Sequence, residues 1–416
     1  MTNKLFAALM FFITAATFAQ EGSSSPYSFY GIGEMRFRGT ADTRAMGGIS
    51  VLADSIHYNL QNPALLSRLK LTTFSVGGTF SKNTLKTQSQ DAKAQRTVLD
   101  YLAVGFPMGK FSAGFGLAPL TSVGYKINRP ATDDNPEGRK YSGTGGINKV
   151  FAGAAYQFNK NFSIGAEVSY NFGEIETVGL YTISGVQFGS REINRSVASG
   201  VAFNTGIAYQ GKLNEKLSIY ASSNFSPHMV LSFGNERKIA TIQFLQLGGQ
   251  AIIDEDDVPV ADTKVSLPAQ FAFGAGVGEV KKWMVGSELT LMHNSSLNNR
   301  FADMGNSTFE NGMRVSIGGY YVPNYNSFTD YFKKVTYRAG LKYEKSGLVI
   351  NGENINDMAF TVGAGLPLAG TFSNINLGAE IGRRGTTSQG LIQENYANFT
   401  VGLSFNDRWF VKRRYD

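Results

Sequence analysis

Apolar and polar side chains alternate along most of the chain, a pattern typical of strands in a sheet whose two faces differ. Between residues 162 and 172, every second residue is aromatic or aliphatic, and the residues between them are polar or glycine, with one alanine on the apolar face. Residues 149–158 alternate in the same way, and the short link 159–161 predicts a β-hairpin. The alternation returns near residues 201–209, 283–291, 335–343, 360–366, 375–381 and 399–405.

These segments predict a transmembrane antiparallel β-barrel, an all-β fold of about fourteen strands of roughly 9–13 residues each. The charged residues indicate which face meets lipid, because a Lys or Arg on the lipid face would cost about 2–4 kcal/mol at the bilayer midplane. All of them fall on the glycine-rich and polar face, which we expect to line the lumen: Glu167, Glu288, Arg314, Arg338, Lys342 and Glu380. A soluble β-sandwich has the same alternation with its apolar face inside, but so many long spans with short turns on one side favour the barrel.

The connectors between predicted strands alternate in length, as periplasmic turns and extracellular loops do in outer-membrane barrels. We expect long connectors near 82–97, 128–146, 179–195, 232–265, 294–312, 346–356 and 384–394. Residues 324–334 form a longer connector where a short turn is expected. In residues 98–106 both faces are apolar, so the pattern does not assign Asp100 to a face.

The N-terminus has the features of a cleaved export signal, predicted over residues 1–19. Its apolar run, residues 5–19, is shorter than the roughly 20 residues that a membrane-spanning helix needs. An uncleaved anchor is the alternative. The predicted organisation is therefore a signal peptide (1–19), a plug (20–68), a barrel (69–405) and a tail (406–416), with export to the bacterial outer membrane.

Composition agrees with an exported, aromatic-rich β-protein. The 416 residues include 48 Gly, 31 Phe and 19 Tyr but no Cys, so stability cannot come from disulfides. The formal net charge is +7, but the positive residues are spread along the chain rather than gathered in a basic stripe. Nucleic-acid binding is therefore not expected.

No motif predicts an enzyme, a cofactor site or a metal site. GAGVG at 274–278 lies inside an alternating strand, whereas a phosphate-binding loop lies between a strand and a helix. The acidic run at 254–262 is either a Ca²⁺ site or a solvated loop tip, and consecutive carboxylates favour the tip. The three histidines, His57, His228 and His293, lack the spacing of a catalytic or metal motif.

The segment before the first predicted strand is compact and irregular, and we expect it to fill the lumen of the barrel. Fourteen strands would enclose a lumen too wide for wall side chains alone to fill. Gly47 and Gly48 permit close backbone approach, and Asn62-Pro63 ends the segment because proline disfavours helix at the residue before it.

These residues resemble the hatch of the FadL family, outer-membrane channels for long-chain fatty acids and other hydrophobic compounds. The likeness rests on Arg44-Ala45, Gly47-Gly48, Ala53-Asp54 and Asn62-Pro63-Ala64-Leu65, with weaker matches at 114–127 and 266–274. The resemblance implies diffusion-driven uptake of a hydrophobic small molecule. The implied gating residues are Arg44, Gly47, Gly48, Asp54, Asn62, Pro63 and Ala64.

The resemblance also implies a lateral exit into the membrane at Pro119 and Gly124. Proline within a strand removes a ladder hydrogen bond, so Pro119 marks either such an opening or an irregularity of the strand. Arg36, Arg38 and Arg44 are candidates to tie the hatch to Glu167, Glu288 and Glu380. Arg314, Arg338 and Lys342 either belong to a lumen salt-bridge network, which mixed charges favour, or attract a substrate carboxylate.

An alternative function is a non-transporting barrel that serves as a partner in protein secretion or surface assembly. A continuous apolar tunnel reaching Pro119 would favour transport, and a polar, filled lumen would favour the partner function. The expected partners are outer-membrane lipid, a hydrophobic substrate and the barrel-assembly machinery. The end of the chain departs from the family, because Phe405 is followed by NDRWFVKRRYD.

Overall fold

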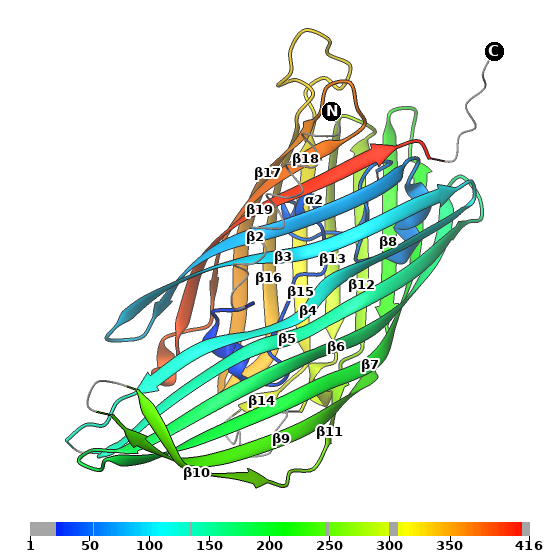
Figure 1. The fold of residues 1–416 in the computed structure, drawn as a ribbon. Helices are drawn as coiled ribbons and strands as arrows, with labels where there is room; N and C mark the ends of the chain where they lie inside the picture. Colours follow the sequence, from blue (N-terminus) through cyan, green and yellow to red (C-terminus); the bar gives the residue numbers. More distant parts are fainter. Residues whose placement is uncertain (1–21, 53, 134, 246–248, 299–306, 410–416) are drawn as a thin grey trace.

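The computed structural model describes residues 22–52, 54–133, 135–245, 249–298 and 307–409, and its wall is a closed antiparallel barrel (Figure 1). Closure occurs where β19 pairs with β2. The predicted signal peptide and the end of the predicted tail lie outside the described residues. No helix in the described part of the chain is long and apolar enough to cross a membrane.

The wall contains fourteen strands, as predicted, because several shorter strands follow one another in line. One side is formed by β2 (Thr72–Lys86), β3 (Asp91–Met108), β4 (Phe111–Arg129), β5 (Glu137–Gln157), β6 (Phe162–Ile183) and β7 (Phe188–Lys212). β8 (Leu217–Ser226) and β9 (Met229–Phe244) form one wall strand against β7, and β10 (Gln250–Val258), β11 (Thr263–Leu267) and β12 (Gln270–Glu279) return beside it. The rest are β13 (Trp283–Met292), β14 (Ser307–Phe309) with β15 (Gly312–Tyr321), β16 (Thr336–Ile350), β17 (Glu353–Pro367), β18 (Asn374–Arg384) and β19 (Gln393–Asp407).

The outer face of the barrel is apolar and the inner face polar, as the alternation predicts. On β6, Val168 and Tyr170 are about half exposed, whereas the alternate residues Glu167, Ser169 and Asn171 are buried. An exposed apolar surface on a closed barrel is stable in hydrocarbon, where every backbone group must be paired within the protein. The chain is therefore an outer-membrane barrel, and the β-sandwich alternative is wrong.

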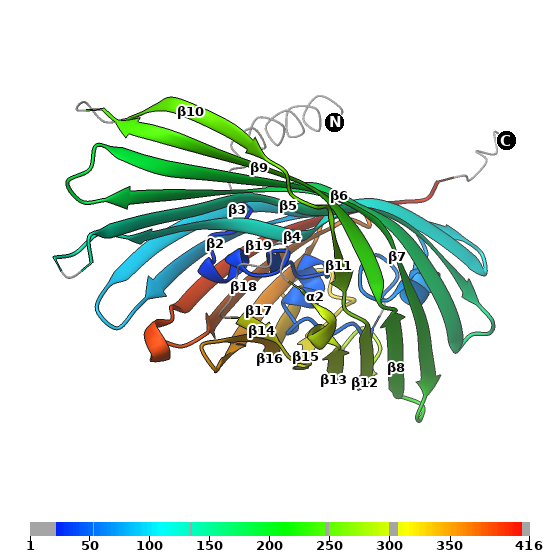
Figure 2. The same cartoon turned by 90° about the horizontal axis from the view of Figure 1, so that it is seen from below.

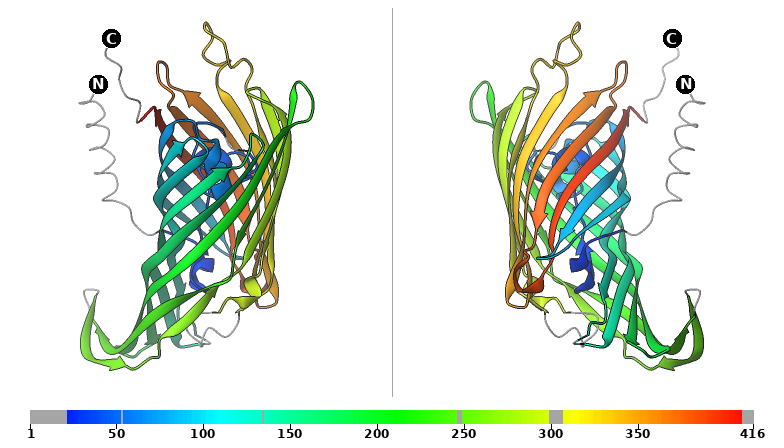
Figure 3. Two further views of the ribbon diagram at one scale, coloured as in Figure 1. Left: turned by 90° about the vertical axis from the view of Figure 1, so that its right-hand side faces the viewer. Right: turned by 90° about the vertical axis from the view of Figure 1, so that its left-hand side faces the viewer.

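The predicted strand lengths are wrong for half of the barrel. β7 runs for 25 residues, and much of the expected loops 82–97, 128–146 and 179–195 is strand. The strands in these stretches extend beyond the main body of the barrel. At their far end, β9 and β10 curve away from the wall (Figure 3). The acidic run at 254–262 lies largely on β10 rather than in a loop.

The inner face becomes apolar where the strands lose their simple alternation. Phe172 points outward, but Ile175, three residues on, is fully buried, with Gly173 between them at a positive φ of 159°. The wall strands β4, β5 and β7 also have buried apolar residues on their inner faces. The pairing of β4 with β5 shifts register after Pro119. One consequence is an inward-facing apolar cluster: Ile32, Leu120, Val123, Tyr125, Ile147, Ile175, Ala198, Leu231, Phe233, Val265 and Leu267.

The N-terminal segment, residues 22–68, lies inside the ring of strands (Figure 2). It contains η1 (Pro26–Phe29), β1 (Glu34–Met35), α2 (Ala41–Arg44) and η2 (Pro63–Arg68). Two further short helices, η3 (Asn294–Ser296) and η4 (Ser388–Gly390), lie in connectors. Apart from the connector 322–335, the wall turns at the opposite end from these connectors are short, so that end faces the periplasm.

Candidate functional site: a break in the wall and the cavity behind it

The wall is interrupted between β3 and β4. Their ladder begins at Met108 and Phe111 and stops at Leu102 and Leu117. Beyond this point β3 continues to pair with β2, and β4 continues to pair with β5. The two strands diverge below their shared ladder (Figure 1). Pro119 lies two residues beyond the end of the ladder, and since proline cannot donate a backbone hydrogen bond, it suits a strand edge.

β1 of the N-terminal segment lies in this break and pairs with β4. Glu34 is the register partner of Ser122 and Met35 that of Thr121. The backbone N–H of Arg36 donates to the carbonyl oxygen of Leu120 at 3.0 Å. Gly124 has no room for a side chain, because a Cβ there would lie 1.9 Å from the Ser23 carbonyl oxygen. The N-terminal segment therefore lies directly against the edge that β3 leaves open.

On the β3 side, ion pairs take the place of backbone bonds. Glu34 Oε2 lies 3.1 Å from Arg96 Nη1, and Arg36 Nη2 lies 3.2 Å from Asp100 Oδ1. Burial acts to raise the pKa of Glu34, but Arg96 and Arg384 outweigh it and hold that pKa well below its usual range. Burial, with Arg96 nearby, lowers the pKa of Arg36 to about 10, so it stays charged at neutral pH.

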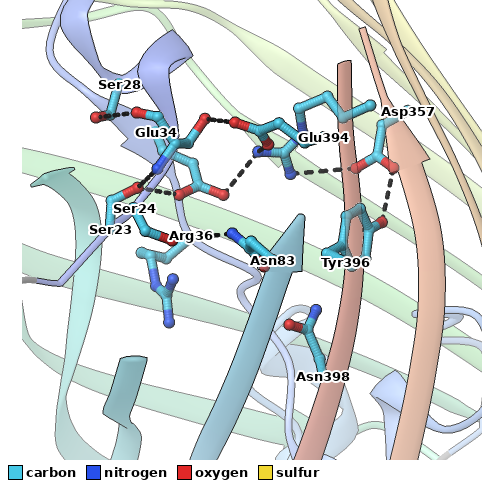
Figure 4. Close-up of polar contacts among 12 residues, drawn as sticks. Ser23, Ser24, Ser28, Glu34, Arg36, Asn83, Asp357, Glu394, Tyr396 and Asn398 are labelled. Atoms are coloured by element: carbon cyan, nitrogen blue, oxygen red, sulfur yellow. Dashed lines mark hydrogen bonds and ion pairs between the residues drawn. The ribbon is translucent and has the colours of Figure 1, made fainter. Parts of the chain in front are cut away.

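A second set of polar contacts fixes the segment to β17, β18 and β19 (Figure 4). Arg384 Nη1 lies 2.7 Å from Glu34 Oε1, and Arg384 Nη2 lies 3.2 Å from Asp357 Oδ2. Ser25 donates to Glu394, and the Tyr396 hydroxyl donates to Asp357 at 2.7 Å. Glu34 therefore binds Arg96 on β3 and Arg384 on β18 through one carboxylate.

The arginines predicted to reach Glu167, Glu288 and Glu380 have other partners. Arg36 and Arg44 both pair with Asp100, and Arg38 donates to the side-chain oxygen of Gln270 at 3.0 Å. The predicted carboxylates are held differently: Glu167 by Lys149 at 3.1 Å, Glu380 by Lys342 at 2.9 Å, and Glu288 by the Ser50 backbone N–H at 2.7 Å. Only Glu288 thus bonds directly to the N-terminal segment, and it does so through backbone.

Of the predicted gating residues, Gly47 lies against β16 and β17, whereas Arg44 lies against β2. The Gly47 N–H donates to Thr361 Oγ1 at 2.9 Å, and a Cβ on Gly47 would lie 2.7 Å from the Leu341 carbonyl oxygen. Gly47 and Gly48 both have positive φ, 71° and 88°, which only glycine adopts without strain. Arg44 donates to Thr79 at 2.8 Å and lies 4.9 Å above the Phe37 ring.

Asn62, Pro63 and Ala64 lie against β6 and β7. The Asn62 side-chain oxygen accepts from the Ala64 N–H at 3.0 Å and so caps η2, while its amide nitrogen donates to the carbonyl oxygens of Ile207 and Ser223, each at 3.2 Å. Wall glycines make room for this contact, since a Cβ on Gly206 would lie 1.9 Å from Asn62 Oδ1. Asparagine is needed because it caps the helix and bonds the wall at once.

Asp54 lies apart from these contacts and orders its own loop. It accepts from the backbone N–H groups of Ile56 and His57 and lies 2.5 Å from His57 Nδ1. Burial acts to raise the pKa of Asp54, but the ion pair with His57 lowers it below its usual range; burial acts to lower the pKa of His57, but Asp54 raises it. The His57 Nε2 atom lies 3.0 Å from Asn376 Nδ2.

A cavity of about 310 Å³ lies between the N-terminal segment and the wall. One part of its lining is apolar and includes Leu120, Leu267 and Leu297. Another part is charged and includes the Glu34 contacts and the Lys342–Glu380 pair. Arg96, Leu120 and Met35 all line it, so the cavity reaches the break between β3 and β4.

Two lumen arginines that line this cavity form no direct ion pair within the described chain: Arg38, with Glu167 at longer range, and Arg314, with Glu288 at longer range. Arg314 donates to Thr290 Oγ1 at 3.3 Å. Arg338, predicted like Arg314 to be a lumen charge, donates to Asn376 at 2.9 Å. In the described ranges, no group of three or more His, Asp or Glu side chains is placed to hold a metal ion.

A family model described as BamG matches residues 1–416. The chain belongs to the BamG family. No curated protein matches it in sequence. Solved structures share its fold: the toluene transporter TbuX of Ralstonia pickettii has a TM-score of 0.62 at 15% identity, over 89% of this chain and 99% of that one.

Two more structures extend this comparison for the BamG-family chain. The toluene transporter TodX of Pseudomonas putida has a TM-score of 0.60 at 16% identity, covering 91% of this chain and 100% of that one. A FadL homologue of Pseudomonas aeruginosa has a TM-score of 0.58 at 13% identity, covering 91% and 99%. The resemblance to the FadL family is confirmed for the fold, and none of these three structures is described as an enzyme.

Several residues of this BamG-family site were not predicted from the sequence: Glu34, Arg96, Asp357, Arg384 and Glu394. Arg96, Arg384 and Glu394 lie in stretches that the pattern assigns to long loops, and Glu34 precedes the recognisable motif. The available signal was that the alternating face of mostly polar residues and glycine on β18 and β19 continues to Arg384 and Glu394, past the predicted strand ends.

Proposed function

We propose that the protein lets small hydrophobic molecules with an acidic end, such as long-chain fatty acids, diffuse from outside into the outer membrane. The observation that carries this proposal is the break between β3 and β4, with the internal cavity reaching it. A solute that leaves through the wall returns directly to hydrocarbon and does not cross a water-filled pore. The structural neighbours described as toluene transporters support passage of hydrophobic compounds through this fold.

The route requires β1 to move, which makes the N-terminal segment a hatch. β1 is held by a two-residue ladder, one further backbone hydrogen bond, two ion pairs at the break and the Glu34–Arg384 ion pair. Each backbone hydrogen bond contributes about 1 kcal/mol, and removing one partner of a buried ion pair costs about 3–5 kcal/mol, so the ion pairs are the main barrier to release. Separating two wall strands breaks a far longer ladder. The exit would therefore open by displacement of β1 while the barrel stays closed.

The acidic end of the substrate is inferred from Arg38 and Arg314. Both line the cavity, and in the described ranges neither forms a direct ion pair, although Glu167 and Glu288 act on them electrostatically at longer range. A guanidinium group within a membrane protein is costly unless it is paired, so an unpaired one in a cavity points to an anion. The apolar cluster around Leu120 and Leu267 would contact the rest of the molecule.

A disulfide lock tests the exit directly, because the natural chain has no Cys. Met35→Cys with Thr121→Cys joins register partners of β1 and β4. We expect oxidation to stop oleate uptake by cells that lack any other fatty-acid channel, and reduction to restore it. The matched control, Val277→Cys with Val285→Cys, joins register partners of β12 and β13 within the wall and should not affect uptake. Full uptake by the oxidised lock would refute the proposed exit.

The alternative, a partner barrel without transport, is favoured by the charge along the route. Glu34, Arg36, Arg96 and Asp100 form ion pairs at the break, so the residues described there include charged side chains and are not all apolar. Absence of bound lipid in protein purified from membranes, together with unchanged oleate uptake on deletion of the gene, would favour this second function.

A further inference from the structure

The connector between β15 and β16 differs from the other turns at the periplasmic end. It has fourteen residues, 322–335, whereas its neighbours at 280–282 and 368–373 have three and six. It projects farther along the barrel axis than the adjacent turns (Figures 1 and 3, gold). A turn that only closed a hairpin would not need this length.

The connector has a defined shape. Asn324 N–H donates to the Lys333 carbonyl oxygen at 2.8 Å, and Lys334 N–H donates to that of Tyr331 at 3.0 Å. The Tyr331 hydroxyl donates to the Pro367 carbonyl oxygen at 3.2 Å, which fixes the connector to the next turn. The positions of its side chains are therefore set by the fold.

This ordered connector exposes large aromatic side chains. Phe328 is 98% exposed and Phe332 72%, and Tyr325 is about half exposed. Burying one such side chain contributes about 1.5–3 kcal/mol, so their joint exposure is unfavourable unless another surface covers them. Phe328 lies seven residues beyond the end of β15 at Tyr321, on the projecting part of the connector and not among the strand-end aromatics that contact lipid.

Two lysines contact tyrosine rings of this connector. Lys281 Nζ lies 4.5 Å from the centre of the Tyr325 ring, and Lys334 Nζ lies 6.0 Å from that of Tyr331. Lys282 and Lys333 pair with Glu279 and Asp330. The four lysines thus outnumber the two acids, so the connector and the adjacent turn carry a net positive charge beside the exposed aromatic residues.

We propose that this connector docks a soluble periplasmic protein that presents an apolar pocket rimmed by carboxylates. Phe328 and Phe332 fit the pocket, since exposed aromatic side chains are the usual anchors of protein interfaces. Lys281 and Lys334 complement the carboxylates and would speed association. The narrow, projecting form of the connector suits insertion into a pocket better than contact with a flat lipid surface. The inference does not depend on transport.

Photocrosslinking in whole cells tests this docking. p-Benzoyl-phenylalanine is placed at 328 or 332, and at Thr371 on the neighbouring turn as the matched control. We expect one discrete protein adduct from 328 and 332 but not from 371, with the crosslinked site mapped beside Asp or Glu residues. Lys281→Glu with Lys334→Glu should reduce the adduct roughly tenfold. Heat-modifiable gel mobility checks that each variant is folded.

Three outcomes would overturn the proposal. They are adducts only to phospholipid, equal adducts from 328 and 371, or a protein adduct that the lysine reversals do not change. A folded variant that gives no adduct at 328 or 332 would also contradict it.

Discussion

Arg38 and Arg314 are the residues on which the substrate class depends. One belongs to the N-terminal segment and the other to β15, and both line the same cavity. Glu167, Lys342 and Glu380 form ion pairs. Arg338, which also bonds only a neutral amide, does not line this cavity. The unpaired charge is therefore local to one part of the cavity, where an anionic group would be stabilised by hydrogen bonds from both guanidinium groups.

Arg314→Met is expected to reduce oleate uptake about tenfold and to leave uptake of oleyl alcohol unchanged. A hydrogen bond to a charged group contributes about 1.5–3 kcal/mol, and 1.4 kcal/mol corresponds to a factor of ten. Arg139→Met is the matched control, because Arg139 lies on an exposed hairpin and pairs with Glu137. Equal losses for the acid and the alcohol would show that Arg314 supports the fold and does not bind an anion.

Asp100 shows why some site residues escape prediction from the sequence. In the ladder between β2 and β3, Gly77 pairs with Tyr101 and Gly78 with Leu99, so Asp100 is the extra residue of a β-bulge. Asp100 and Tyr101 are both buried although they are adjacent. A bulge breaks the alternation on which face assignment depends, and only the three-dimensional pairing shows it.

At the scale of elements, wall glycines determine where the N-terminal segment lies. Glycines on the inner face of β6, β7, β15, β16 and β17 stand where a Cβ would clash with its backbone or side chains: Gly165, Gly206, Gly318, Gly340 and Gly363. The sequence places these glycines on the lumen face correctly. It could not pair them with the segment, because the contacts join residues more than a hundred positions apart.

Gly206→Ala is expected to loosen η2 from the wall. The new Cβ would lie 1.9 Å from Asn62 Oδ1, and overpacking of this kind costs about 1–3 kcal/mol. We expect faster proteolysis within residues 22–68 of the detergent-solubilised barrel while the wall stays resistant. Gly234→Ala is the control, since the nearest atom to its Cβ would be 4.0 Å away. The same cleavage rate in both variants would mean that the glycine contact does not hold η2.

At the scale of the whole molecule, the barrel and its N-terminal segment form one polar interior inside an apolar surface. Periodicity predicts the number of strands and the face of each strand on which the charges lie, and the resemblance predicts the position of the plug motif. The break between β3 and β4 does not follow from the sequence, because both strands continue on either side of it with other partners. The ion pair between Glu34 and Arg384 does not follow from the sequence either, because it joins residues from opposite ends of the chain.

Deleting residues 22–68 tests whether this interior closes the barrel. The fourteen wall strands would remain, since β2 begins at Thr72, but the lumen would lose the side chains that fill it. We expect the full protein to conduct almost no current in planar bilayers and the deletion variant to open steps of an ohmic pore. The remaining wall pairs, Lys149–Glu167 and Lys342–Glu380, carry both signs, so the pore should discriminate little between K⁺ and Cl⁻. Replacing 324–333 by a short turn is the control. That connector lies outside the lumen, so its loss should leave the barrel with almost no conductance. Equal conductance before and after the deletion would mean that the segment lies in the barrel without closing it, and a gate at β1 would then have nothing to control.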